Sequence, residues 1–304
     1  MSDQAIIFDR DLLRTRRERA RPSYAGFDFL EREAADRLAE RLEDIRRSFS
    51  VAAELGARSG FLGQLIRASG KVGTLIQSDL ALGWAKDRAK DGPALVLDEE
   101  ALPFAEGGLE AVFGTLSLQW VNDLPGTLLQ CRRALKPDGL LLMSLFGGQS
   151  LHELRDALAE AEIELTSGLS PRVSPMTEVR DLGALLQRAG FALPMVDADT
   201  ITVTYENAFA LMRDLKGMGE ANIVVERRRC FSTRALFLRA AEIYQQRYAG
   251  PDGRVPATFQ LLTLTAWAPA DSQPKPLKPG SATQKLGDVL RVTENVESET
   301  DDDE

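Results

Sequence analysis

The stretch Val51-Ala52-Ala53-Glu54-Leu55-Gly56-Ala57-Arg58-Ser59-Gly60 decides the fold of this chain. It begins as a short apolar run of the kind that forms a buried parallel strand, and the run stops at Gly56. A segment of helical period, residues 60–68, follows the second glycine. A strand, a glycine turn and a helix in this order predict one βα unit of a parallel sheet, with free backbone amides at the start of the helix. Glycines at such a turn let the backbone approach a ligand, but they are as common in turns that bind nothing.

The same alternation continues along the chain. Apolar runs lie at 72–76, 94–97, 111–116 and 139–143, and helical segments lie between them, most clearly at 124–135. Two later β-rich runs, 200–205 and 257–267, complete the set, with helical segments predicted at 151–165 and 178–189. Short strands that alternate with helices predict an α/β fold with a parallel sheet covered on both faces.

Segments of different composition flank this core. Residues 1–26 form an N-terminal basic arm of helical character, closed by Pro22-Ser23. Residues 27–268 are the main domain, which opens with an amphipathic helix at 27–47 and carries a helical insertion at about 207–248. Residues 269–304 are rich in Pro, Lys, Ser and acids, and we expect a disordered acidic tail.

Composition excludes several classes of function. With 2 cysteines and 1 histidine, the chain has no ligand set for zinc or a two-His iron site and no Ser-His-Asp triad, so no metal residues are predicted. The net charge of -9 disfavours nucleic-acid binding through phosphates. No apolar run approaches the ~20 residues of a transmembrane helix. The acidic start, with Asp3, Asp9 and Asp11, does not look like a targeting segment, which predicts a cytoplasmic, bacterial protein of undetermined oligomeric state.

Acidic side chains follow two of the predicted strands. In an open parallel sheet, ligands bind beyond the carboxyl ends of the strands. Asp79 closes the second strand about twenty residues after Gly60, where an acid can accept both hydroxyls of a ribose. Asp98 and Glu99 follow the third strand and could accept from an adenine amine, although each of these acids could equally cap a helix. Together they predict a nucleoside-containing cofactor.

One motif is specific enough to indicate a family. Leu116-Ser117-Leu118-Gln119-Trp120-Val121-Asn122-Asp123-Leu124-Pro125 resembles the post-strand motif of the biotin-pathway malonyl-carrier-protein methyltransferases. It resembles more closely that of the mitochondrial complex I assembly factors that have a methyltransferase fold and are associated with arginine hydroxylation. The resemblance runs from about residue 6 to 285 and includes Ser170-Pro171-Arg172-Val173-Ser174-Pro175 and Leu215-Lys216-Gly217-Met218-Gly219-Glu220-Ala221-Asn222.

The resemblance implies a Rossmann-like class I methyltransferase fold, with a seven-stranded, mostly parallel sheet and an antiparallel edge hairpin. It implies S-adenosylmethionine (SAM) as cofactor and a complex I subunit as protein client. The positions expected to bind the cofactor are Glu54, Gly56, Arg58, Gly60, Asp79, Leu80, Asp98, Glu99 and Leu116. The polar groups expected to face the acceptor as catalytic residues are Asp123, Glu153 and Arg155.

Arg58 departs from the family pattern. It replaces the middle glycine of the turn, so a long cationic side chain lies where the backbone should approach a sulfonium ligand. The steric and like-charge effects together predict a loss of roughly 100-fold in SAM affinity, unless Arg58 turns into solvent or pairs with the SAM carboxylate.

Two functions therefore remain open. One is a SAM-dependent methyltransferase that acts on a protein or carboxylate acceptor, with arginine modification on a complex I subunit as a variant. The other is a non-catalytic assembly factor with a degenerate SAM site, in which the insertion and the basic arm hold a partner; Arg227-Arg228-Arg229 would suit an acidic client surface.

Overall fold

The structure is a computed structural model that describes residues 6–274. The chain divides into two compact units after Pro269. Most of the predicted acidic tail lies outside the described residues. The predicted domain boundary at residue 26 stays a prediction.

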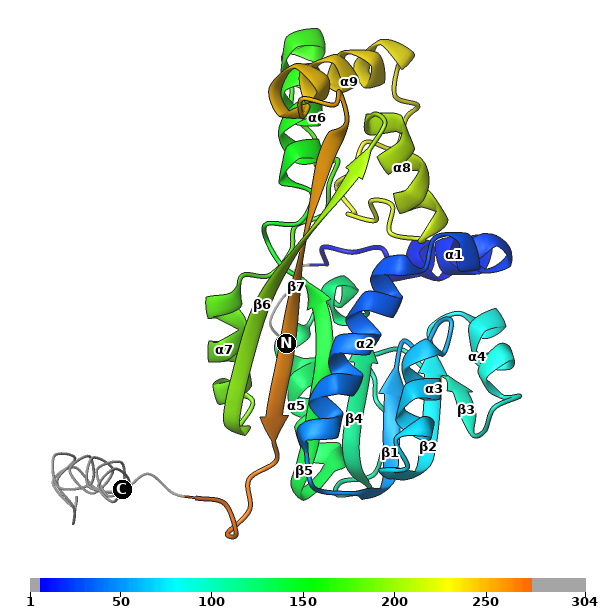
Figure 1. The fold of residues 1–304 in the computed structure, drawn as a ribbon, viewed down its shortest axis with the longest axis vertical. Coiled ribbons are helices and arrows are strands. Elements are labelled where there is room, and N and C mark those ends of the chain that lie inside the picture. The colour runs from blue at the N-terminus through cyan, green and yellow to red at the C-terminus, as the bar shows by residue number, and fades with distance from the viewer. Residues whose placement is uncertain (1–5, 275–304) are drawn as a thin grey trace, which may run out of the picture. The chain divides into compact units, whose positions relative to one another are not determined.

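A single 7-stranded sheet forms the centre, in the order β3-β2-β1-β4-β5-β7-β6 (Figure 1). Neighbouring strands from β3 to β5 pair in parallel, and β7 runs antiparallel to both β5 and β6. This confirms the predicted mostly parallel sheet with an antiparallel pair at its edge. The strands are β1 Phe49–Leu55, β2 Val72–Asp79, β3 Ala94–Val96, β4 Leu109–Thr115, β5 Leu135–Phe146, β6 Ala192–Tyr205 and β7 Val255–Trp267.

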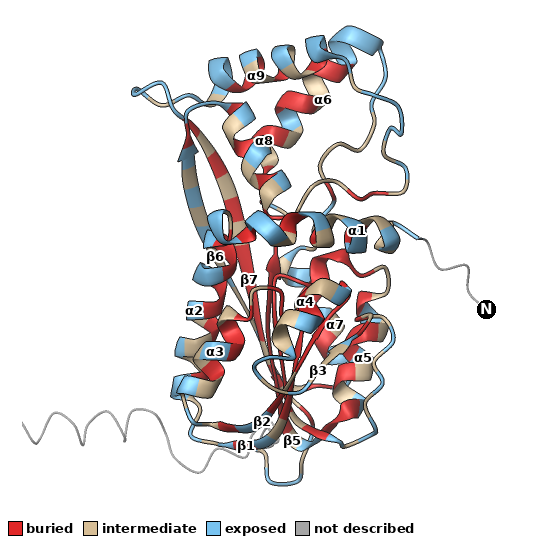
Figure 2. Cartoon of the chain, turned by 90° about the vertical axis from the view of Figure 1, so that its right-hand side faces the viewer, coloured by how far each residue is buried: buried red, intermediate tan, exposed pale blue. Residues whose placement is uncertain are grey.

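Helices cover both faces of the sheet, as the nearly continuous apolar strands require. On one face α2 (Phe29–Asp44) and α3 (Phe61–Ala68) pack through Leu38 and Ile66. On the other face α5 (Leu124–Ala134) and α7 (Val179–Arg188) pack through Leu128 and Leu186. The short helix α4 (Leu82–Arg88) contacts β2 and β3. The buried residues accordingly concentrate along the sheet and the inner sides of these helices (Figure 2).

The predicted insertion is present as two helices, α8 (Ala208–Gly217) and α9 (Arg234–Tyr248), joined by irregular chain. Together with α6 (His152–Thr166) they pack around the far ends of β6 and β7, beyond the body of the sheet (Figure 1). This second core contains Leu211, Tyr244 and Phe259. Among the described residues, no helix is long and apolar enough to span a membrane.

The N-terminal arm packs onto the protein as a helix, α1 (Arg10–Ala20), followed by a 3₁₀ helix, η1 (Arg21–Gly26). Asp9 caps α1 by accepting from the Leu12 amide. The start of the arm is fixed by Asn122, whose Oδ1 accepts from the amides of Ile7 and Phe8 at 2.8 and 2.7 Å. These contacts place α1 across the carboxyl ends of the parallel strands, over the predicted site.

Candidate functional site

The turn after β1 is built by the close approach of two loops. Gly56 and Gly60 have φ values of +66° and +76°, a region that favours glycine. A Cβ on Gly56 would collide with the Cβ of Ser117, which follows β4. The Ser117 hydroxyl donates to the Leu55 carbonyl at 3.3 Å, which joins the ends of β1 and β4. The sequence therefore places Gly56 where the two loops touch, whereas Gly60 faces the Arg88 side chain of α4.

The Arg58 side chain turns inward from this turn and is 2% exposed. Its Nη2 donates to the carbonyl oxygens of Thr115 and Leu116 at 3.1 and 2.8 Å, and its Nη1 pairs with Glu220 Oε1 at 2.8 Å. Its guanidinium carbon lies 5.9 Å from the centre of the Tyr24 ring. The expectation that Arg58 could turn into solvent is therefore wrong, because carbonyl oxygens at the end of β4 and the Glu220 carboxylate after α8 satisfy its charge inside the protein.

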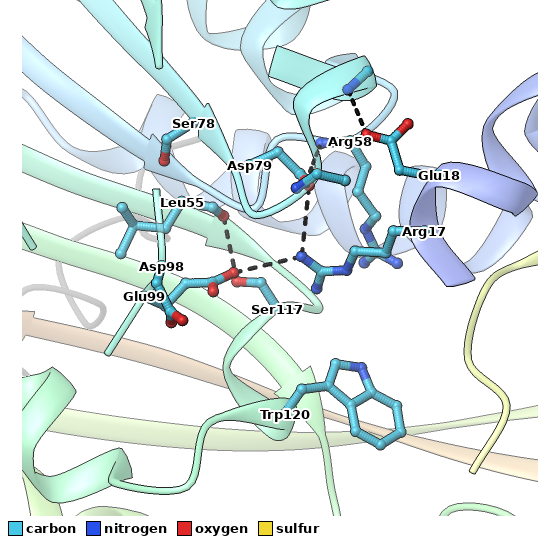
Figure 3. Close-up of polar contacts among 12 residues, drawn as sticks. Arg17, Glu18, Leu55, Arg58, Ser78, Asp79, Asp98, Glu99, Ser117 and Trp120 are labelled. Atoms are coloured by element: carbon cyan, nitrogen blue, oxygen red, sulfur yellow. Dashed lines mark hydrogen bonds and ion pairs between the residues drawn. The ribbon is translucent and has the colours of Figure 1, made fainter. Parts of the chain in front are cut away.

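A second arginine, Arg17 of α1, lies between two of the predicted cofactor acids (Figure 3). Its Nη1 is 3.8 Å from Asp79 Oδ1 and 3.5 Å from Glu99 Oε1, and the side chain is 3% exposed. Asp79 also accepts from the amides of Ala81 and Arg58. Burial raises the pKa of Asp79, and the charge of Arg17 acts in the opposite direction.

Arg10 of the same helix pairs with Asp98, the third of these acids, and with the second oxygen of Glu99. Its Nη2 pairs with Asp98 Oδ1 at 2.7 Å and with Glu99, and its Nη1 donates to the Trp120 carbonyl at 3.2 Å. Sequence reasoning missed Arg10 and Arg17 as site residues. Their signal was present in the arm, because Arg10, Leu13, Arg17 and Ala20 recur at helical spacing and three of them are buried.

These contacts decide whether SAM fits the described conformation. The acids Asp79, Asp98 and Glu99 stand at the strand ends as a nucleoside would require, so the donor set is chemically suitable. The space at the strand ends is too small for SAM, because the Arg58 and Arg17 side chains fill it. The cavity left beside Arg58 has a volume of about 10 Å³. A pocket that holds a ligand as large as SAM has a volume of several hundred Å³. SAM therefore does not fit in this conformation.

A larger cavity opens next to this closed site, and we call it the side cavity. It has a volume of about 300 Å³ and is lined by residues that include Trp120, Leu154, Met212, Leu215, Glu220 and Phe237. The largely apolar walls also carry polar residues, namely Trp120, Arg172, Ser174, Glu220 and Asn222. Arg172 pairs with Glu162 at 2.7 Å. Glu220 Oε2 and Trp120 Nε1 are both buried and have no hydrogen-bond partner. Such atoms are costly in a protein interior unless a ligand or water satisfies them.

Glu220 lines both the side cavity and the small cavity beside Arg58, so it stands at the junction of the two. Gly219, with φ +77°, ends α8, and the Glu220 amide donates to the Leu215 carbonyl at 2.9 Å. The sequence contained this residue within the family-type stretch at 215–222 but gave no reason to choose it, because the stretch lies far from the strands in sequence.

The three predicted catalytic residues have other partners. Asp123 caps α5 by accepting from the Gly126 amide at 2.8 Å. Glu153 is 3% exposed and accepts from the Thr258 amide at 3.2 Å, and Arg155 donates to the Ser150 carbonyl at 3.1 Å. None of these three lines the side cavity, and their catalytic role stays a prediction.

The remaining predicted cofactor residues are buried. Glu54 accepts from the Gln77 amide group at 2.7 Å, and burial raises the pKa of its carboxyl to about 8. Leu80 packs with Phe8 and Trp120. Leu116 supplies the carbonyl that binds Arg58. Among the described residues, no group of three or more His, Cys, Asp or Glu is placed to hold a metal ion.

The strand order, the glycine turn and the acids at the strand ends define a protein of the class I methyltransferase fold. Residues 53–143 match the methyltransferase domain family. The chain is 42% identical to arginine-hydroxylase NDUFAF5 of Rattus norvegicus, a mitochondrial protein, over 95% of this chain and 85% of that protein. It is 41% identical to the Homo sapiens protein of the same name over 94% and 84% of the two chains. This chain belongs to the NDUFAF5 family.

More distant matches agree with the fold. The malonyl-[acyl-carrier protein] O-methyltransferase of Laribacter hongkongensis is 34% identical over 88% of this chain and 92% of that protein. A solved SAM-dependent methyltransferase of Thermotoga maritima has a TM-score of 0.50 and 14% identity, and covers 84% of this chain and 99% of its own. The predicted cytoplasmic, bacterial localisation is contradicted by the NDUFAF5 relatives, which are named as mitochondrial proteins of eukaryotes.

Proposed function

We propose that this chain binds an arginine side chain of a protein client in the side cavity, with Glu220 as the group that receives the guanidinium. The observation that carries the proposal is the buried Glu220 Oε2, which has no hydrogen-bond partner at the edge of an apolar cavity of about 300 Å³. An arginine combines an apolar stem with a planar cation, so its stem suits the walls and its charge suits the carboxylate.

The family supports the same class of substrate. NDUFAF5 is named an arginine hydroxylase, and the resemblance of the sequence implies a client in respiratory complex I. Arg58 already shows how this part of the protein binds a guanidinium, since it takes one Glu220 oxygen and lies against Tyr24. A client arginine in the side cavity would take the other oxygen.

The test uses a peptide that contains one arginine and a matched peptide with citrulline, which keeps the shape but removes the charge. Trp120 lines the cavity, so the NMR signal of its indole N–H, assigned with Trp120→Phe, reports occupation. We expect the arginine peptide to shift this signal and the citrulline peptide to leave it unchanged. Glu220→Gln should weaken binding by about tenfold or more, while the control Glu226→Gln, an exposed residue of the same segment, should leave it unchanged. An unshifted Trp120 signal, or equal binding by Glu220→Gln, would contradict the proposal.

SAM-dependent transfer is the second candidate, and the acids Asp79 and Glu99 at the strand ends favour it. In this case Arg58 and the arm must leave the site before SAM enters. Calorimetric titration of the native chain, Arg58→Gly and Arg17→Ala with SAM and its demethylated product tests this requirement. We expect the native chain to bind SAM roughly 100-fold more weakly than Arg58→Gly. Tight binding by the native chain would instead show that the site opens readily and would favour transfer.

A further inference from the structure

A strongly basic depression lies between the arm and the end of α8. It has a volume of about 500 Å³ and is lined by α1, η1 and the end of α8. The helices α1 and α8 lie next to one another in Figures 1 and 2, and η1 contacts both. We call it the basic hollow and define it by its cations, Arg16, Arg19, Arg213 and Lys216. Its floor is apolar and includes Ala20 and Phe27.

The four cations of the basic hollow are not neutralised by the protein. None of these four has a carboxylate of the described residues within 4.0 Å, unlike Arg10, Arg21 and Arg172. Arg16 is half-buried and donates only to the Asn222 carbonyl. Its pKa is lowered, first by burial and then by repulsion from Arg227. In a chain with a net charge of -9, a cluster of unpaired cations around a depression indicates an anionic ligand.

The local backbone decides which kind of anion suits the basic hollow. Phosphate sites are usually built from free amides at a helix N-terminus or in a backbone nest. Here the hollow faces the last turns of α1 and α8, which present carbonyl groups, and the Gly219 amide already donates to the Lys216 carbonyl. Long, separated cations over an apolar floor instead match carboxylates spaced along a peptide.

We propose that the basic hollow binds an acidic segment of a protein partner. Its carboxylates pair with the four cations, and the aliphatic parts of its side chains cover Ala20 and Phe27. The basic run 227–229 would suit such a partner by its sequence, although a solvated face is the favoured interpretation of it. It is partly engaged within the chain, since Arg227 pairs with Asp9 at 3.1 Å and Arg228 contacts Cys230 at 2.9 Å. This proposal does not depend on arginine binding in the side cavity.

The test measures fluorescence anisotropy of a labelled peptide of alternating Glu and Ala on the full chain. The variant Arg213→Glu with Lys216→Glu changes two exposed cations of the hollow. The control Arg180→Glu with Arg188→Glu makes the same change in net charge on two exposed cations of α7. We expect the native chain and the control to bind the peptide, and the hollow variant to bind at least about tenfold more weakly. Binding should also weaken as salt is raised.

Three results would overturn the proposal. The first is equal binding by the hollow variant and the control, which would show that only net charge matters. The second is tight binding of pyrophosphate that displaces the peptide and is lost in the hollow variant, which would assign the hollow to a small phosphate. The third is binding to phosphatidylglycerol vesicles that is lost in the same variant while the peptide does not bind, which would assign it to a lipid surface. Circular dichroism of each variant confirms that the fold is unchanged.

Discussion

At the scale of single residues, the closed site depends on arginines that face buried carboxylates. Arg58 lies within 2.8 Å of Glu220 and 3.7 Å of Glu31, and all three side chains are at most 8% exposed. A buried charge is tolerated only while its partners remain, so removing one partner is costly for those that are left. Arg58→Met should therefore destabilise the protein by about 3–5 kcal/mol, measured by denaturant unfolding. Adding Glu220→Gln should recover part of this loss, whereas additive losses would show that the pair is not coupled.

Glu54 gives a pH-dependent prediction. Burial raises the pKa of its carboxyl from 4.5 to about 8, so the folded protein holds a proton that the unfolded chain has released between these values. Its contribution to stability is therefore fully present below pH 4.5 and is lost as the pH rises toward 8. Glu54→Gln keeps the acceptor for Gln77 and removes the charge, so it should stabilise the protein by about 3 kcal/mol near neutral pH. The difference in unfolding free energy between the native chain and Glu54→Gln, measured across this pH range, should vanish at low pH. A difference that does not change with pH would contradict the raised pKa of Glu54.

At the scale of elements, the start of the arm is held by Asn122, together with backbone hydrogen bonds to Ile223 and Val225. Asn122 accepts from the Ile7 and Phe8 amides and donates to the Phe8 carbonyl at 3.2 Å. Asn122→Ala removes all three hydrogen bonds, each of which contributes about 0.5–1.5 kcal/mol. Hydrogen exchange of the α1 amides should then accelerate by about tenfold or more. The matched control Asn207→Ala, which removes the cap of α8, should leave α1 protected.

How far the sequence predicted these elements depended on whether their signals were local. The buried strands were predicted because each is a short local apolar run, and the long helices because each carries its own apolar period. The helix α4 was missed because it has 7 residues, too few to show a period. The first half of β6 was missed because this edge strand alternates weakly and contains Pro194. The glycine turn and Asp79 were predicted as parts of one site, whereas Arg17 and Glu220 join it only through packing between segments far apart in sequence.

At the scale of the whole molecule, global unfolding opens the core that packs α5 against the sheet. One thiol reports this event. Cys131 is 0% exposed in the core between α5 and the sheet, and burial raises its pKa to about 12, whereas Cys230 is exposed. The thiolate is the reactive form of a cysteine. A thiol reagent should therefore label Cys230 as soon as it is mixed in, and Cys131 only when the core opens.

The labelling rate of Cys131 should therefore measure global unfolding. We expect it to be at least about a thousandfold slower than that of Cys230, since native domains are typically stable by 5–15 kcal/mol. The rate should rise in Arg58→Met, which removes a buried partner, and stay unchanged in Asn122→Ala if release of the arm leaves the cores intact. Cys230→Ser isolates the slow signal and serves as the control. Fast labelling of Cys131 in this control would show that α5 opens locally without the sheet, and a rise in Asn122→Ala would show that the arm unfolds with the cores rather than before them.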